Sequence, residues 1–431
     1  MSSPEPLRPP AARVGRILVG GDAEGVVALR WRRDGVHAER SADGVRWRSM
    51  PLGDAAERLR EMVPLCAGAE ERGSLFCADA ADAVREVRIG AAEPAQPEGF
   101  RPSDDSGEWY EPSEGLPEMA IVRDAQDGAY RAFFCARRRT GRHPERRGCI
   151  GVARSSDMAA WRAEPPVFAP NAHARLFAPH VITEGGRTLI FYATAEEGGI
   201  RALRFATAAS PDGPYETLDP DVLSHDVRQA LHTARVGGRR LVFFTRPATD
   251  ATGAEEVSRP ATLEFHADGR PWFRYYDALT RLTPKTIFQT EASLASRDIL
   301  VRVLPRYGAN VRLTARVANR GAKAVGLLLR TSITGHDNVT LWLEYEAGAV
   351  SLRRGVNGRL LARTRRALEA QGEHRVTVWA EGGYADVYLD DEWVLTGQTD
   401  TRRSGGFGVA VRGGEAAVTE MTAQVIEASA G

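Results

Sequence analysis

A short turn pattern returns at a nearly constant interval through the first 275 residues of the chain. Its first copy is Ser41-Ala-Asp43-Gly-Val-Arg-Trp47, and in every copy an aspartate precedes an aromatic residue by three or four positions. The four aspartates are Asp43, Asp157, Asp212 and Asp268. They are 114, 55 and 56 residues apart, so the first gap has room for one degenerate copy, expected near residue 100. The pattern predicts five like units of about 56 residues.

Each unit also contains short apolar or alternating runs separated by turns rich in Gly and Asp. In the fourth unit these runs cover residues 177–182, 188–193 and 200–206. Such runs are typical of hairpin-linked β-strands, and four strands repeated around an axis form the blades of a propeller. The repeated aspartate is expected to cap a tight turn, and the aromatic residue to pack between blades. We therefore predict a five-bladed β-propeller over residues 13–277.

The repeat ends after Tyr276, and a second pattern follows it. Residues 278–288 have the character of a linker, and the remainder is a series of short runs that alternate at period two, such as 311–317 and 374–379. Alternation with turns every 8–12 residues is typical of a β-sandwich. The predicted fold class is thus all-β, a five-bladed propeller followed by a jelly-roll or concanavalin-like β-sandwich over residues 289–428.

Composition limits the partners and the compartment. The 57 lysine and arginine residues balance 57 aspartate and glutamate residues, so no net charge draws the chain to nucleic acid or to an anionic membrane. No apolar run is long enough for a membrane helix, and residues 1–16 lack the apolar core of a signal peptide. Four cysteines without CxxC spacing favour free thiols. We expect a cytoplasmic protein with a small-molecule or oligosaccharide ligand; its oligomeric state is not predicted.

Two segments resemble a known group of enzymes. Gly151-Val-Ala-Arg-Ser-Ser-Asp-Met-Ala-Ala-Trp161 resembles the G-x-A-x-S-x-D-x-x-x-W strand of the five-bladed propeller glycosidases of glycoside hydrolase families 32, 43 and 68. Phe177-Ala-Pro-His180-Val, followed by Arg187-Thr-Leu-Ile-Phe-Tyr192, resembles their W-A-P-[DE]-V blade opening. A sandwich after the propeller is similar to family 32 and to several members of family 43. The resemblance implies two aspartates and a glutamate that point from the inner strands of different blades into one axial funnel.

The chain departs from this family pattern at the acids. His180 occupies the position where the family has an acidic residue after Ala-Pro. Aligning the blade turns places His232 at the equivalent position of blade five and Glu118 in blade three. In blade one the nearest carboxylates are Asp22 and Glu24. The catalytic acids of the family are therefore matched only in part.

The first hypothesis is a working glycoside hydrolase or transglycosidase with shifted carboxylates. Glu118 would be the general acid, its pKa raised by an apolar funnel. Asp22 or Asp226 would be the base or nucleophile, and Glu114 is a further candidate. The proposed substrate-binding residues are Arg175, Arg228, His180, His232 and Trp109.

Two other hypotheses follow from the same residues. Glu118, His180 and His232 form a usable ligand set for a divalent metal ion at the propeller axis, with His173 and His225 as additional ligands; no other cofactor is predicted. Alternatively, the propeller binds a sugar without turnover, and the sandwich is a lectin-like module. Its candidate stacking residues, most of them at alternating strand positions that are also typical of core, are Trp342, Tyr345, Trp379, Tyr384 and Trp393.

Overall fold

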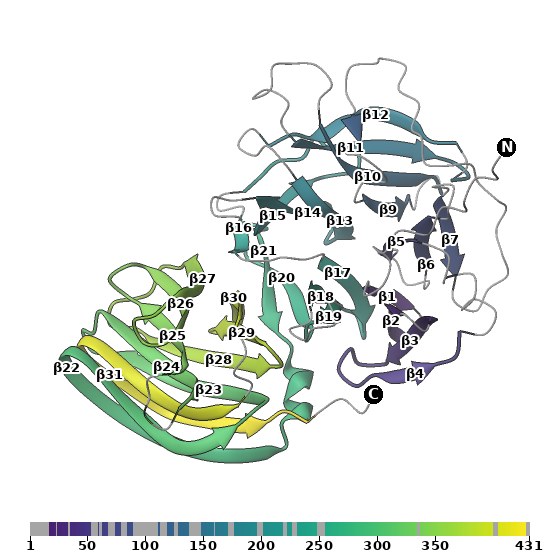
Figure 1. The fold of residues 1–431 in the computed structure, drawn as a ribbon. Coiled ribbons are helices and arrows are strands. Elements are labelled where there is room, and N and C mark those ends of the chain that lie inside the picture. The colour runs from purple at the N-terminus through teal and green to yellow at the C-terminus, as the bar shows by residue number, and fades with distance from the viewer. Residues whose placement is uncertain are drawn as a thin grey trace, which may run out of the picture.

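The computed structural model shows a chain made almost entirely of β-strands (Figure 1). The structure describes residues 17–22, 24–32, 35–52, 59, 63–67, 74–78, 84–88, 111–112, 119–124, 128–137, 148–158, 160–170, 176–195, 201–218, 222–225, 231–247, 255–332, 334, 337–399 and 404–427. Within these residues no helix has the length and apolar character needed to cross a membrane.

The N-terminal strands form antiparallel meanders in which most consecutive strands pair; β8 and β9 both pair with β10, and β19 and β20 both pair with β18. The first three blades consist of β1 (Ile17–Asp22), β2 (Gly25–Arg32), β3 (Gly35–Ser41) and β4 (Arg48–Met50); β5 (Val63–Ala67), β6 (Ser74–Ala78) and β7 (Val84–Arg88); and β8 (Glu111–Pro112), β9 (Met119–Arg123), β10 (Tyr130–Arg137), β11 (Gly148–Ser155) and β12 (Arg162–Phe168). The last two consist of β13 (Leu176–Glu184), β14 (Arg187–Ala195), β15 (Arg201–Ala208) and β16 (Val222–His225); and β17 (Leu231–Val236), β18 (Arg239–Pro247), β19 (Glu255–Val257), β20 (Ala261–Phe265) and β21 (Pro271–Tyr275).

The innermost strand of each sheet contributes to a closed ring. In the part of the chain that the structure describes, β1 contacts β5, β5 contacts β9, β9 contacts β13, β13 contacts β17 and β17 contacts β1. Figure 1 shows these strands around a common centre. The ring confirms the predicted five-bladed propeller.

Alternating side chains on β14 join blade four to both of its neighbours. On β14, Leu189 and Phe191 belong to the core shared with blade five. Ile190 and Tyr192, on the opposite face, belong to the core shared with blade three. Because both faces are buried, the strand is apolar throughout, which is why its sequence does not alternate.

The repeated turn has the structural role predicted for it. In blade one the Asp43 carboxylate accepts hydrogen bonds from the backbone N–H groups of Val45 and Arg46, at 2.9 and 3.0 Å. Trp47 packs edge-on against Phe243 of blade five, with ring centroids 6.1 Å apart. The turn thus fixes an aromatic side chain that joins neighbouring blades.

Blade one contains two glycines whose comparison gives a stability prediction. Gly25 and Gly35 have φ angles of +141° and +146°, which strain any other residue. A Cβ at Gly25 would lie 2.3 Å from the Ser41 carbonyl oxygen, whereas one at Gly35 meets no atom within 4 Å. We expect Gly35→Ala to lower the free energy of unfolding by about 1–3 kcal/mol, through strain alone. Gly25→Ala should lower the free energy of unfolding, measured by urea denaturation, clearly more than Gly35→Ala does. Equal losses in the two variants would contradict the close approach of the Ser41 backbone to Gly25.

Two long strands organise the C-terminal sandwich. β22 (Lys285–Gly308) and β31 (Gly405–Val425) pair along most of their length, and β31 also pairs with β23 through its C-terminal half and with β24 through its N-terminal half. One sheet therefore has the order β30-β29-β28-β23-β31 and the other β31-β24-β25-β26-β27. The remaining strands are β23 (Val311–Asn319), β24 (Ala324–Thr331), β25 (Val339–Glu344), β26 (Ala349–Arg354), β27 (Leu360–Arg365), β28 (Glu373–Glu381), β29 (Tyr384–Leu389) and β30 (Glu392–Gln398).

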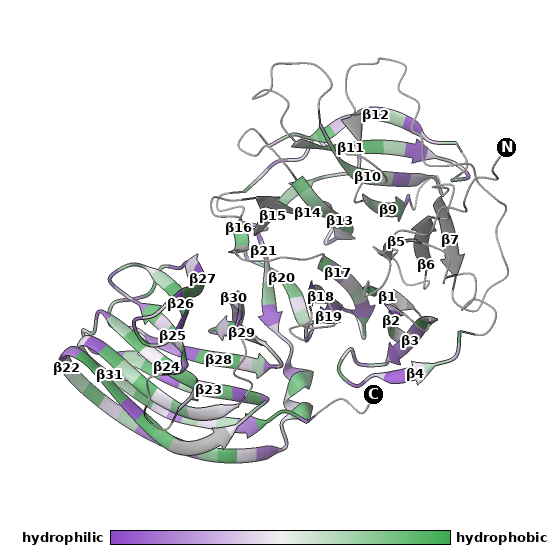
Figure 2. Ribbon diagram, viewed as in Figure 1, coloured by the Kyte–Doolittle hydropathy of each residue, from purple (hydrophilic) through white to green (hydrophobic). Residues whose placement is uncertain are grey.

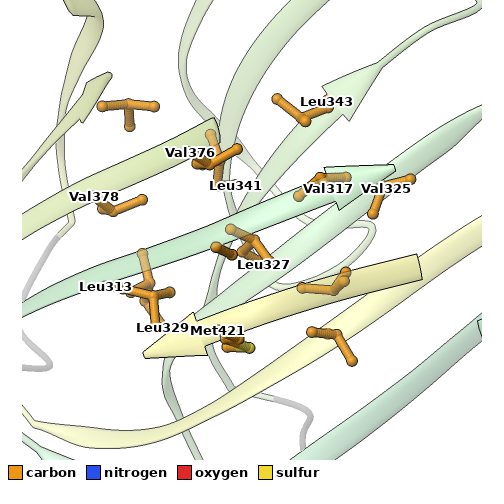
Figure 3. Close-up of a cluster of buried hydrophobic side chains, with 14 of the residues drawn as sticks. Leu313, Val317, Val325, Leu327, Leu329, Leu341, Leu343, Val376, Val378 and Met421 are labelled. Carbon is orange, nitrogen blue, oxygen red and sulfur yellow. The ribbon is translucent and has the colours of Figure 1, made fainter. Parts of the chain in front are cut away.

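Aliphatic side chains from both sheets fill the sandwich. Figure 2 shows apolar and polar residues alternating along these strands. Figure 3 shows the apolar side chains meeting in the interior, with Leu313 and Val378 from one sheet and Leu327 and Leu341 from the other. The aromatic residues considered above as stacking platforms are core instead. Trp342, Trp379, Tyr384 and Trp393 are all buried, and Tyr345 is partly buried against the same core.

The propeller and the sandwich share a core. β21 pairs with β30 through Arg274 and Glu392, so the sheet of blade five continues into the sandwich. Trp393 of β30 stacks on Phe244 of β18 at a centroid distance of 4.9 Å. The segment predicted as a linker is packed rather than loose. It contains the 3-10 helix η4 (Asp277–Leu282), whose two leucines are buried, and the first residues of β22.

Candidate functional site

His180 and His232 occupy equivalent positions on the inner strands of neighbouring blades. The β13–β14 hairpin turns at Gly185-Gly186 and the β17–β18 hairpin at Gly237-Gly238. His180 pairs with Phe191 and His232 pairs with Phe243, each histidine four residues before the last paired residue of its strand. The predicted equivalence of the two histidines is confirmed.

Blades three and one carry apolar residues at the same count from their hairpin turns. In blade three the turn is longer and closes with a hydrogen bond from the Asp124 N–H to the Ala129 carbonyl, at 2.7 Å. Ala120 lies four residues before this closure and pairs with Phe133. In blade one the residue four positions before the last paired residue is Leu18. Glu118, which the alignment of the blade turns placed level with the histidines, lies outside the described residues, so its position stays a prediction.

The other predicted site residues are placed as follows. Asp22 is the last residue of β1 and pairs with Gly25, so its backbone lies at the turn end of the inner strand. At ~3.3 Å per residue, this end is ~13 Å along the strand from the histidine level. The remaining candidates lie outside the described residues; these are Trp109, Glu114, Glu118, His173, Arg175, Asp226 and Arg228.

Both histidines are buried and hydrogen-bonded to threonines. His180 Nε2 lies 3.0 Å from the hydroxyl of Thr233 on β17, and thus bridges blades four and five. The same hydroxyl oxygen accepts a hydrogen bond from Arg240 at 3.4 Å, and Arg240 also binds the Glu184 carboxylate at 2.6 Å. His232 Nε2 lies 3.5 Å from the hydroxyl of Thr245.

The environment keeps the two imidazoles neutral. Burial, reinforced by the nearby His232 and Arg240, lowers the pKa of His180 to about 3. Burial lowers the pKa of His232 to about 4. At neutral pH neither imidazole holds the additional proton of an imidazolium, so neither is suited to act as a general acid. A neutral imidazole has one donor and one acceptor nitrogen, which suits it to hold a polar neighbour or a sugar hydroxyl.

The described residues do not by themselves form a metal site. Among them, no group of three or more His, Cys, Asp or Glu side chains is arranged to hold a metal ion. The metal hypothesis also requires Glu118, which lies outside these residues. In addition, the Nε2 atom of His180 already has a hydroxyl neighbour at 3.0 Å.

Sequence reasoning missed the partners of His180. Thr233 and Arg240 belong to the adjacent blade, and Glu184 closes the hairpin of His180 itself. No local signal in the sequence links Glu184 to Arg240, because the two residues are 56 positions apart.

The architecture, a five-bladed propeller followed by a C-terminal β-sandwich, is shared with solved structures of glycosidases. Among solved structures, exo-inulinase from Aspergillus awamori is similar with a TM-score of 0.65 and 9% identity, over 94% of this chain and 94% of the inulinase chain. Sucrose-6-phosphate hydrolase from Lactobacillus gasseri is similar with a TM-score of 0.64 and 13% identity, over 95% of this chain and 91% of its own. The GH32 β-fructofuranosidase BmSUC1 from Bombyx mori is similar with a TM-score of 0.63 and 10% identity, over 96% of this chain and 90% of its own.

These similarities concern the fold. No protein-family model matches the sequence, and no curated protein matches it. The resemblance first indicated by the strand motifs is confirmed as an architecture that extends over both parts of the chain.

Proposed function

We propose that this chain is a glycoside-hydrolase-like protein that acts on a small fructose-containing glycoside or oligosaccharide at the axial funnel of its propeller. The observation that carries the proposal is the match of both the propeller and the sandwich to one class of solved structures, over more than nine-tenths of this chain. The three proteins compared are named for inulin, sucrose 6-phosphate and β-fructofuranosides.

The starts of the inner strands support this position for the chemistry. β9, β13 and β17 begin at Met119, Leu176 and Leu231. Because each is the innermost strand of a similar meander, their starts belong to one end of the ring. Glu118 and Arg175 directly precede two of these starts in the sequence.

We assign the catalytic roles accordingly. Glu118 is the general acid and Asp226 the nucleophile or base, while Glu114 is an alternative acid. Asp22 is the weaker candidate, because it ends β1 at the turn instead of preceding an inner strand. Arg228, with Arg175 and Trp109, holds the substrate. His180 and His232 contribute neutral hydrogen-bonding groups to the wall, as their lowered pKa values require.

Fructose release from sucrose, sucrose 6-phosphate and short inulin oligosaccharides tests the assignment. Loss of a general acid or base typically lowers the rate 10²- to 10⁴-fold. We expect falls of roughly that size for Glu118→Gln and Asp226→Asn. The matched change Glu415→Gln, on the exposed sandwich surface, should leave the rate unchanged. Full activity in Glu118→Gln would remove this residue from the mechanism.

A second candidate, sugar binding without turnover, is favoured by one specific observation. On the described inner strands β9, β13 and β17, the one carboxylate is that of Glu184, which Arg240 binds, and both histidines are neutral. Under this function, calorimetry detects binding of fructose or inulin oligosaccharides, His180→Ala weakens it, and no fructose is released. Release of fructose by the wild-type protein would exclude it.

A further inference from the structure

A cavity of about 320 Å³ lies away from the propeller axis, where blades four and five meet the sandwich. One side is formed by β15, β16, β21 and the turn between β20 and β21, and the other by β27 and β30. Figure 1 shows β16 and β21 opposite β27 and β30 at this junction. Cavities between domains are preferred positions for small-molecule ligands, and this volume is at the lower end of their usual range.

The propeller side of the cavity presents an aromatic platform. Trp272 is only partly buried and stacks on His266 with a centroid distance of 5.6 Å and an angle of 24° between the rings. Trp272 is the aromatic residue of the last repeated turn. The corresponding Trp161 and Tyr215 are buried in the cores of their blades, and Trp47 packs against Phe243. Trp272 alone among these four lines the cavity, which is typical of a ring that receives a ligand.

The charged groups around the cavity favour an anion. Arg270, Arg365 and Arg366 line it, with Glu392 as the one carboxylate among its described lining residues. Arg366 is neutralised by a two-point ion pair with Glu392, at 3.0 and 2.6 Å. Arg270 is held by Asp268 at 2.6 Å through Nε.

One arginine of the three is left without such a partner. Arg365 is exposed, and its side chain forms no ion pair or hydrogen bond with the residues that the structure describes. A guanidinium presents paired N–H groups that match the oxygens of a phosphate or carboxylate. The positive excess of the cavity thus lies on Arg365, at the sandwich side and across from the Trp272 platform.

We propose that this cavity is a second ligand site that binds an anionic monosaccharide, with the sugar ring on Trp272 and the anionic group on Arg365. The shared chemistry is that of a sugar phosphate or a sugar acid. The site is independent of the proposed catalysis, because none of its residues belongs to the inner strands. A bound ligand would contact both the propeller and the sandwich.

Isothermal titration calorimetry with four probes tests the site: fructose 6-phosphate, glucuronate, neutral fructose and inorganic phosphate. We expect at least one of the two anionic sugars to bind at least tenfold more tightly than fructose and than phosphate, and to bind more weakly as salt is raised. The stronger of the two identifies the anionic group. Failure of both to bind, or equal affinity for inorganic phosphate, would overturn the proposal.

Variants locate the binding. Trp272→Ala and Arg365→Ala should each lower the affinity for the anionic sugar at least tenfold. Trp272→Phe, which keeps an aromatic ring, should retain most of the affinity. Arg302→Ala, an exposed arginine on β22 outside the cavity, is the matched control and should bind as the wild type does. Unchanged affinity in both Trp272→Ala and Arg365→Ala would show that the ligand binds elsewhere, and would overturn the assignment.

Discussion

Replacing Arg246 with methionine is expected to lower the free energy of unfolding by about 3–5 kcal/mol, because it leaves a buried carboxylate without its counter-ion. Arg246 on β18 donates to Glu256 at 2.9 Å and to both oxygens of Asp386 on β29, at 3.1 and 3.2 Å. Its guanidinium also lies 4.2 Å from the centre of the Tyr384 ring. The side chains of Arg246 and Asp386 are only 5% and 7% exposed, so little water replaces the lost partner.

A matched control isolates the effect of burial. Arg316 on the sandwich also lies between two carboxylates, Glu373 at 2.9 Å and Glu420 at 2.8 Å, but its side chain is 47% exposed. Urea denaturation of Arg316→Met should show little change, because water screens such a pair. Adding Asp386→Asn to Arg246→Met should recover part of the loss by removing the uncompensated charge. Equal losses in the free energy of unfolding for Arg246→Met and Arg316→Met would contradict a stabilising role for the buried ion pair between propeller and sandwich.

Acid should destabilise the protein steeply through His180 and His232. In an unfolded chain an imidazole binds a proton near pH 6.5. In the folded protein burial lowers the pKa of His180 to about 3 and that of His232 to about 4. Between these values and pH 6.5 the unfolded state holds more protons than the folded state, so stability falls as the pH falls. The two groups together should account for a loss of about 4 kcal/mol between pH 7 and pH 5.

The measurement is the free energy of unfolding in urea at pH 7, 6 and 5. The double variant His180→Gln/His232→Gln should lose about 4 kcal/mol less over this range than the wild type. Arg240, which lies beside His180, keeps its charge over this pH range and does not contribute to the pH dependence of the free energy of unfolding. His37→Gln, a partly buried histidine on β3 of blade one, serves as the control. A double variant with the wild-type slope would show that the histidines are protonated in the folded protein.

The fold could be predicted from the sequence because its repeat imposes local requirements. In three of the four turns the aspartate accepts a hydrogen bond from a backbone N–H group, as Asp43 does, and three of the four aromatic residues pack within or between blades. These requirements act within a few residues, so they are visible as a pattern. Trp272 satisfies the same pattern but lines a cavity, and no local signal distinguishes it.

The candidate site was less predictable because it depends on register between distant segments. The turn of blade three is longer than the Gly-Gly turns of blades four and five, so a count along the sequence does not fix which residue faces the histidines. The ion pair between Arg246 and Asp386 joins residues that are 140 positions apart, and no sequence pattern links the two. The equivalent positions of the two histidines could be predicted because their hairpins have the same Gly-Gly turn and therefore the same count of residues.

The most direct test of an axial sugar site is a crystal structure of the protein in complex with fructose. The closed ring of inner strands predicts a fructose molecule on the propeller axis, at the end where β9, β13 and β17 begin and next to Glu118. An empty axis at saturating fructose, or fructose bound only in the Trp272 cavity, would contradict a sugar-binding funnel.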